Sequence, residues 1–212
     1  MTVTVSPVFL LNSATGQAEA AELWDAITET QLADYEGEWL PEQFKAVQRL
    51  KRAGVERKHW PQSRHWDWRR KTAALQGMLA NPGFSVVCGD LTQGMMLVDT
   101  TMKRARIDSQ KGKNLVYVSF VENAPWNRKE LLFDPPRYRG VGSVLMRAAV
   151  ELSKHEDFKG RIGLHSLPQS NSFYANTCGM TDLGPDQDYQ GLRYFEMTPE
   201  QAEAFIAKGG RT

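Results

Sequence analysis

The stretch that decides the fold reads Arg137-Tyr138-Arg139-Gly140-Val141-Gly142-Ser143 and continues as Val144-Leu145-Met146-Arg147-Ala148-Ala149-Val150. This pattern predicts a glycine-rich loop that opens directly into a helix. Such a loop turns several backbone N–H groups toward one point, and the helix behind it adds the positive end of its dipole. Gly140 and Gly142 can adopt positive φ and leave no Cβ in the way of a ligand. We therefore expect the loop to bind an anion.

The two arginines of the loop indicate which anion it binds. Arg137 and Arg139 carry fixed positive charge in a forked donor geometry that suits phosphate, so a pyrophosphate is the expected ligand. The ATP-binding P-loop is excluded, because no Lys-Ser or Lys-Thr follows Gly142. The GxGxxG dinucleotide fingerprint does not fit either, because no third glycine follows the pair.

A second motif follows about thirty residues later. Residues 160–168, Gly-Arg-Ile-Gly-Leu-His-Ser-Leu-Pro, predict a short strand that ends at proline. Residues 170–180, Ser-Asn-Ser-Phe-Tyr-Ala-Asn-Thr-Cys-Gly-Met, predict a short helix stopped by Gly179. The Arg-x-x-Gly-x-Gly loop, then a helix, a strand and a helix carrying Phe-Tyr, resembles the acyl-CoA-binding core of the GNAT superfamily of N-acyltransferases. The resemblance covers residues 84–198.

This resemblance implies an α/β fold in which a GNAT-like mixed central β-sheet is flanked by helices. It also implies an N-acyltransferase, acetyl by default, that moves the acyl group from acetyl-CoA or another acyl-CoA to a primary amine by direct attack. The acceptor would be an amine-bearing small molecule or a protein, and no metal is implied. The residues that would bind the pyrophosphate of CoA are Arg137, Tyr138, Arg139, Gly140, Val141, Gly142 and Ser143.

Glu122 is the candidate catalytic base. An alkylamine has a pKa near ~10, so a carboxylate, or a water held by one, must take its proton before it can attack. Glu122 ends an expected strand over 115–122, in a part of the fold where the family often supplies the base. Its neighbours Val121 and Pro125-Trp126 would partly desolvate the carboxylate and raise its pKa. The alternative is a solvated charge at the end of a strand.

Tyr174 is the candidate acid. It matches the tyrosine that the family places beside the CoA sulfur, where the hydroxyl can donate to the leaving thiolate. The alternative is a tyrosine packed in the core. Five steps separate Tyr174 from Gly179, whereas four are commoner in the family, so Phe173 is a second candidate for this place and would bring no hydroxyl.

Two other segments depart from the family pattern. The family often has an asparagine seven positions before the tyrosine, holding the pantetheine arm, and here that residue is Leu167. Ser166 or His165 at the strand end could replace it, although His165 is better explained as a packed or surface histidine than as a base. The segment between Glu122 and Arg137 is long, and it resembles a bacterial subgroup with Ala-Pro-Trp-Asn before the loop.

The residues Trp126 and Asn127 of that long segment are candidates for acceptor binding. They would lie over the acyl end of the site and shape the acceptor pocket. An equally good interpretation is a loop tip whose tryptophan is pinned to the core. Two prolines at its end preset the approach to the glycine-rich loop.

Composition limits the class of protein. A hydrophobic content of 41% with six tryptophans allows a substantial core in 212 residues. Cys88 and Cys178 offer neither metal-ligand spacing nor a disulfide framework, which favours a reducing compartment. The run 8–11 is too short for a signal or a membrane span. We expect a cytoplasmic protein away from the membrane.

No linker divides the chain clearly, so we expect a single GNAT-like domain over 1–212. Residues 1–83 would form an N-terminal extension with one strand and mostly helices, and 84–198 the acyl-CoA-binding core. The extension is expected to contain a strand over 2–11 and helices over 17–35, 42–53 and 66–79. A homodimer stays open, because GNAT-like domains frequently pair.

A basic stretch leaves a question about partners. Residues 45–71 hold ten Lys or Arg against two acids, with three tryptophans between them. This composition suits a nucleic-acid surface, and an acyltransferase acting on RNA or an RNA-bound protein is one alternative. The better interpretation is a helix whose tryptophans face the core, since the net charge is only +1. A second alternative is a non-catalytic module that binds acyl-CoA and regulates a partner.

Overall fold

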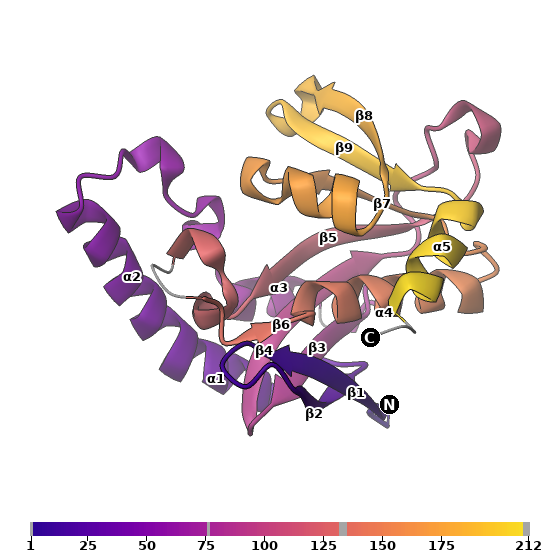
Figure 1. The fold of residues 1–212 in the computed structure, drawn as a ribbon. Helices are drawn as coiled ribbons and strands as arrows, with labels where there is room; N and C mark the ends of the chain where they lie inside the picture. The colour runs from indigo at the N-terminus through magenta and orange to yellow at the C-terminus, as the bar shows by residue number, and fades with distance from the viewer. Residues whose placement is uncertain (1, 76, 132–134, 210–212) are drawn as a thin grey trace. The chain divides into compact units, whose positions relative to one another are not determined.

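The computed structural model describes residues 2–75, 77–131 and 135–209 (Figure 1). Contacts divide the chain into two units. The first unit contains Met1–Met78, Gly83–Met96 and Val121–Leu145, and the second contains Leu79–Pro82, Leu97–Phe120 and Met146–Thr212. The tripeptide 132–134 of the long segment lies outside the described residues.

Three elements run through both units: β4 (Leu91–Asp99), β5 (Val116–Asn123) and α4 (Val141–His155). The first unit adds β1 (Val5–Asn12), β2 (Ala18–Trp24), α1 (Glu29–Asp34), α2 (Leu40–Arg52), α3 (Trp68–Leu75), β3 (Gly83–Cys88) and β6 (Tyr138–Arg139). The second unit adds β7 (Ile162–Ser166), β8 (Thr181–Asp186), β9 (Leu192–Met197) and α5 (Pro199–Gly209).

The strands form a mixed sheet in which the order of hydrogen bonding is β6-β1-β2-β3-β4-β5-β7-β9-β8. β5 and β7 pair in parallel, whereas β1, β7 and β9 make antiparallel pairs with β2, β9 and β8. Helices flank this mostly antiparallel sheet. The α/β fold class expected from the sequence is confirmed.

The predicted helix over 17–35 is wrong in its first half. Residues 18–24 form β2, which pairs with β1 over seven register positions. The turn between the strands is closed by the side chain of Asn12, which accepts hydrogen bonds from the amides of Ala14 and Thr15, and by Gly16 at φ +70°. Pairing along a whole strand outweighs the weak helical spacing of the apolar residues in this stretch.

The helical part of the extension begins later than expected. Thr28 and Gln31 form a capping box at the start of α1, and a π turn over Tyr35–Trp39 joins α1 to α2. Trp39 is buried, and its indole N–H donates to the carbonyl of Thr92 on β4 at 2.9 Å. The helices of the extension are therefore fastened to the sheet of the first unit.

The second unit is built on β7. Figure 1 shows the β8–β9 hairpin and α5 in the yellow end of the colour range. Ile162 and Leu164 of β7 are buried, as are Phe195 and Met197 of the neighbouring β9. This apolar core holds the later part of the GNAT-like pattern, including the segment that carries Tyr174.

Candidate functional site

The glycine-rich loop and the start of α4 have the geometry expected of an anion site. Gly140 has φ +99°, a left-handed backbone conformation that side-chain-bearing residues rarely adopt. The first intrahelical bond runs from the amide of Val144 to the carbonyl of Gly140 at 2.9 Å. The amides of Val141, Gly142 and Ser143 precede that bond and form the open first turn of the helix. Arg137, Arg139 and Gly140 are exposed.

Gly94 on β4, which the sequence did not single out, lets the start of α4 pack closely against that strand. A Cβ built on Gly94 would lie 2.5 Å from Cγ1 of Val141 and 3.0 Å from Cδ1 of Leu145. Only a glycine leaves room for this close approach of helix and strand. Gly94 therefore fixes where the open turn lies within the first unit.

Tyr138 fixes the start of the glycine-rich loop to the sheet and to Asn127. It is buried in β6, which pairs with Leu11 and Asn12 of β1. Its hydroxyl donates to Glu19 at 3.0 Å, and burial raises its pKa to about 12. Its amide donates to Oδ1 of Asn127 at 2.8 Å, so this predicted pyrophosphate donor is already engaged inside the protein.

Trp126 and Asn127 both form hydrogen bonds with the side chain of the buried Gln93. The indole N–H of Trp126 and the side-chain amide of Asn127 both donate to Oε1 of Gln93, at 2.8 and 2.9 Å. Gln93 in turn donates to the carbonyls of Cys88 and Leu91. These contacts pin the segment to β4 and, through Asn127, hold the loop. The role of Trp126 and Asn127 in acceptor binding stays a prediction.

Glu122 is buried, with 7% of its surface exposed, and both of its carboxylate oxygens are bound. Oε1 accepts from the hydroxyl of Ser63 and from the guanidinium of Arg128, each at 2.7 Å. Oε2 accepts from the indole N–H of Trp68 at 2.7 Å. Glu122 is therefore not a solvated charge at a strand end; three donors fix the orientation of its carboxylate.

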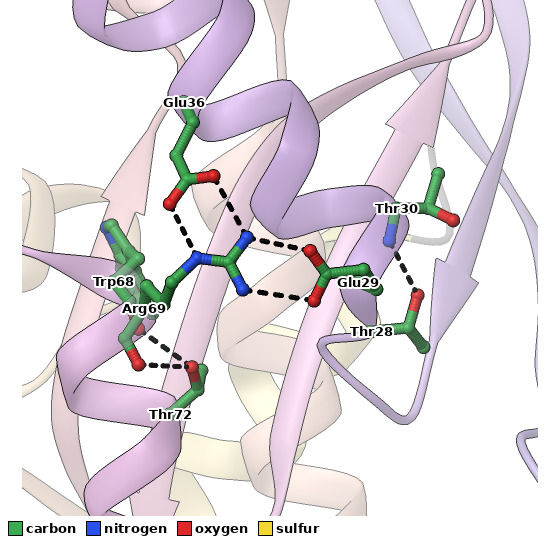
Figure 2. A network of polar contacts seen from close by, with 7 residues as sticks. All are labelled: Thr28, Glu29, Thr30, Glu36, Trp68, Arg69 and Thr72. Atoms are coloured by element: carbon green, nitrogen blue, oxygen red, sulfur yellow. Dashed lines mark hydrogen bonds and ion pairs between the residues drawn. The ribbon is translucent and has the colours of Figure 1, made fainter.

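The helix that carries Trp68 is held in place by an arginine clamp. Figure 2 shows the guanidinium of Arg69 between the carboxylates of Glu29 and Glu36. It bonds Glu29 at 2.7 and 3.0 Å and Glu36 at 2.6 and 2.9 Å. The clamp ties α3 to α1 and the π turn, and so positions the indole that holds Glu122.

The basic, tryptophan-containing stretch is not one helix. It consists of the end of α2, two 3-10 turns over Arg57–His59 and Gln62–His65, and the start of α3. Trp68 is fully buried, and Trp60 packs against the cluster of Ala46, Leu50 and Leu131. The Trp68 ring is therefore not available for stacking on bases, and the Trp60 ring is partly covered by that cluster.

Tyr174 lies in the second unit, buried against Phe195 with ring centroids 5.8 Å apart. It belongs to a π turn over Phe173–Thr177, closed by the amide of Cys178 bonding the carbonyl of Phe173. A π turn holds one residue more than an α turn, which takes up the additional step between Tyr174 and Gly179. Burial raises the pKa of Tyr174, so its hydroxyl keeps the proton at neutral pH.

Ser166 and His165 end β7 with different partners. Ser166 is buried, and its hydroxyl donates to the carbonyl of Leu167 at 2.9 Å. Nε2 of His165 lies 2.9 Å from Asp186, and Nδ1 lies 2.7 Å from the hydroxyl of Tyr117. Burial lowers the pKa of His165 below its usual 6.5. A role for Ser166 in binding CoA stays a prediction.

This neutral, buried histidine gives a testable pH dependence. Since its folded-state pKa lies below the unfolded value of 6.5, the unfolded chain binds the proton first. The contribution of His165 to stability is complete above pH 6.5 and is lost as the pH falls below it, until the folded-state pKa is passed. Urea unfolding at a series of pH values should show this loss in the wild type and a smaller one in His165→Gln. Parallel curves for both proteins would contradict it.

Comparisons with known proteins identify the fold. No protein-family model matches the chain, and neither does any curated protein. It is similar to the GNAT domain of S. lividans PAT, with 14% identity, 91% of this chain and 96% of that chain covered, and a TM-score of 0.53. It is also similar to Mycobacterium smegmatis RimJ in complex with CoA-disulfide, with 13% identity, 97% and 95% coverage and a TM-score of 0.51. Identities this low establish a GNAT-like fold and no more.

Two features are absent from the described part of the chain. None of its helices combines the length and the apolar character that crossing a membrane requires. Within the same residues, no group of three or more His, Cys, Asp or Glu side chains could hold a metal ion. Glu122 lies in the first unit and Tyr174 in the second, and their catalytic roles stay predictions. The fold that carries these residues is GNAT-like.

Proposed function

We propose that this protein is an acyl-CoA-dependent N-acyltransferase, with acetyl as the default acyl group and a primary amine as the acceptor. The observation that carries the proposal is the open first turn of α4. Its amides at Val141, Gly142 and Ser143 follow a left-handed glycine, and two exposed arginines flank the loop. This donor set fits a diphosphate, because it combines helix-terminal amides with forked cations.

Acyl-CoA would supply the thioester carbon that the amine attacks. In the first unit, Arg137, Arg139 and the amides of the first turn would hold its diphosphate, with Tyr138 as support for the loop. Glu122 would take a proton from the attacking amine, directly or through a water. Ser63, Trp68 and Arg128 keep that carboxylate in one orientation. In the second unit, Tyr174 would donate its proton to the departing thiolate.

The assay that tests the proposal is release of free thiol from acetyl-CoA in the presence of a panel of alkylamines, polyamines and lysine peptides. Turnover with at least one amine would support an enzyme. Saturable CoA binding without turnover across the panel would favour the alternative, a non-catalytic acyl-CoA-binding module. Retention on heparin, a polyanion, at about 0.3 M salt would favour an RNA-linked acceptor. Binding that survives this salt concentration requires many contacts between basic side chains and the polyanion.

The two proposed catalytic residues give a further prediction. Glu122→Gln should lower kcat by roughly 10²–10⁴-fold, the usual contribution of a general base. Tyr174→Phe should lower kcat while the Kd for CoA changes little, because only the leaving group is affected. Asn176→Ala, at an exposed position of the same π turn, is the control. If Tyr174→Phe turns over like the wild type, water is the proton source and the assignment fails.

Three finer assignments belong to the same proposal. The Ala124-Pro125-Trp126-Asn127 segment supports membership of the bacterial subgroup that it resembles, and Trp126 and Asn127 would shape its acceptor pocket. Both cysteines are free and buried, which supports a reducing compartment such as the cytoplasm. Size-exclusion chromatography would test whether the chain pairs.

A further inference from the structure

The side chain of Gln93 on β4 is fully buried and makes four hydrogen bonds. Its Nε2 group donates to the carbonyls of Cys88 and Leu91, at 2.9 and 3.1 Å, which flank the turn between β3 and β4. Its Oε1 atom accepts from the indole N–H of Trp126 and the amide of Asn127, at 2.8 and 2.9 Å. A glutamine amide offers two donor hydrogens and two acceptor lone pairs, so its whole capacity is used. These four partners hold the amide in one orientation.

Asn127 connects Gln93 to the beginning of the glycine-rich loop. Its Nδ2 group donates to Gln93, and its Oδ1 atom accepts from the backbone amide of Tyr138 at 2.8 Å. The carbonyl of Trp126 accepts from the backbone amide of Arg137 at 2.9 Å. The amides of Arg137 and Tyr138 are therefore bound within the first unit. The backbone donors for an anion then come from the first turn of α4.

The next residue of β4, Gly94, determines where the other end of the loop lies. A Cβ on Gly94 would lie 2.5 Å from Val141 and 3.0 Å from Leu145, so α4 packs directly against the backbone of the strand. Neighbouring residues of a strand are only about 3.3 Å apart. Gln93 and Gly94 therefore hold the two ends of the loop from adjacent positions on one strand.

We propose that Gln93 is a positioning residue for the diphosphate site, which presets the glycine-rich loop for CoA by acting through Asn127. This inference rests on the proposed function, which assigns the diphosphate of acyl-CoA to the loop. A loop that is already ordered loses little conformational freedom when its ligand binds, so ordering opposes binding less. Gln93 acts on the affinity for the cofactor and not on the chemical step, because none of its four partners is a proposed catalytic group.

The test compares Gln93→Met with Ser85→Ala in calorimetric titration with CoA. Methionine is similar in length to glutamine but forms none of the four bonds. Gln93→Met should bind CoA roughly tenfold more weakly than the wild type, because the loop must then be ordered on binding. Ser85→Ala is the matched control: it removes a buried hydrogen bond of the neighbouring β3, to the carbonyl of Ala26, outside this network. It should lose stability in urea unfolding but bind CoA like the wild type.

Steady-state kinetics separate positioning from a general loss of structure. With an amine that is accepted in the thiol-release assay, Gln93→Met should raise KM for acetyl-CoA about tenfold and change kcat less than about twofold. Asn127→Leu should do the same, and the double variant should be no worse than the weaker single variant, because both changes break one connection. If Asn127→Leu raises only KM for the amine, Asn127 belongs to the acceptor pocket alone and the connection fails.

Amide hydrogen exchange of the free protein gives an answer that does not depend on CoA. The Tyr138 amide should exchange faster in Gln93→Met than in the wild type, and Ser85→Ala should leave its exchange unchanged. If Gln93→Met does not fold, Asn127→Leu serves instead, because it keeps the bonds of Gln93 to Cys88 and Leu91. A wild type that binds no CoA contradicts the proposed function, and exchange then still decides whether Gln93 holds the loop. Unchanged CoA affinity in folded Gln93→Met, or unchanged protection of its Tyr138 amide, overturns the inference.

Discussion

Gly142→Asp should bind CoA on the order of 100-fold or more weakly than the wild type, because it puts a carboxylate into the open first turn of α4, where we propose that the diphosphate binds. Two like charges a few ångströms apart near a protein surface repel by several kcal/mol. The helix itself should not suffer, since an acidic residue in the first turn interacts favourably with the dipole. Calorimetric titration with CoA and a thermal unfolding curve measure the two effects separately.

The neutral isostere Gly142→Asn is the matched control for charge. If repulsion causes the loss, Gly142→Asn should retain much more affinity than Gly142→Asp at equal side-chain size. Equal losses would mean that the position tolerates no side chain at all. CoA binding to Gly142→Asp at wild-type strength would remove the diphosphate from this loop, and with it the basis of the proposed function.

Arg128→Met should destabilise the first unit by about 3 kcal/mol. The guanidinium of Arg128 and the carboxylate of Glu122 form an ion pair at 2.7 Å, with 7% and 5% of the two side chains exposed. Removing the cation leaves a buried carboxylate with two neutral donors. A second cation, Lys71, lies near this carboxylate: burial lowers the pKa of Lys71, and the charge of Glu122 raises it. Because Lys71 still offsets part of the charge of Glu122, we expect a loss of stability in the lower part of the usual range.

A double-mutant cycle checks the origin of this loss. Glu122→Gln combined with Arg128→Met removes both charges, so the double variant should be more stable than Arg128→Met alone in urea unfolding. Lys129→Met, next in sequence but exposed, is the control and should change stability little. A double variant that is less stable than Arg128→Met would show that packing of the arginine side chain dominates, not its charge.

The regular elements of the GNAT-like core could be predicted from the sequence, because each is a local pattern bounded by strong signals. Helix α4 follows a glycine-rich loop and β7 ends before a proline; in the extension, α2 begins next to Pro41 and ends at Arg52, two residues before Gly54. The strand β2 could not be predicted from its own residues, because it forms by pairing with β1. The turn residues Asn12 and Gly16 before β2 were the available signal for a hairpin.

The surroundings of the candidate residues could be predicted only in part, because sequence indicates which residues could carry chemistry but not which residues hold them in place. Glu122 was predicted to be partly desolvated, and it is buried. Its partners Ser63 and Trp68 lie more than fifty positions earlier in the chain and could not be inferred from spacing. The role of Gln93 could have been predicted, because a glutamine inside a buried strand needs hydrogen-bond partners for its side-chain amide.

The pairing of β6 with β1 has a consequence for how the chain is made. β1 pairs with β6 through Leu11–Arg139 and Asn12–Tyr138, so the β1 edge of the N-terminal hairpin stays unpaired until the ribosome has added roughly 115 residues after Trp24. At bacterial and eukaryotic elongation speeds this delay is about 6–25 s. During that interval Phe9, which is 67% exposed even in the finished protein, sits on a hairpin with an open edge. During synthesis the β1 edge is therefore open to pairing with other chains.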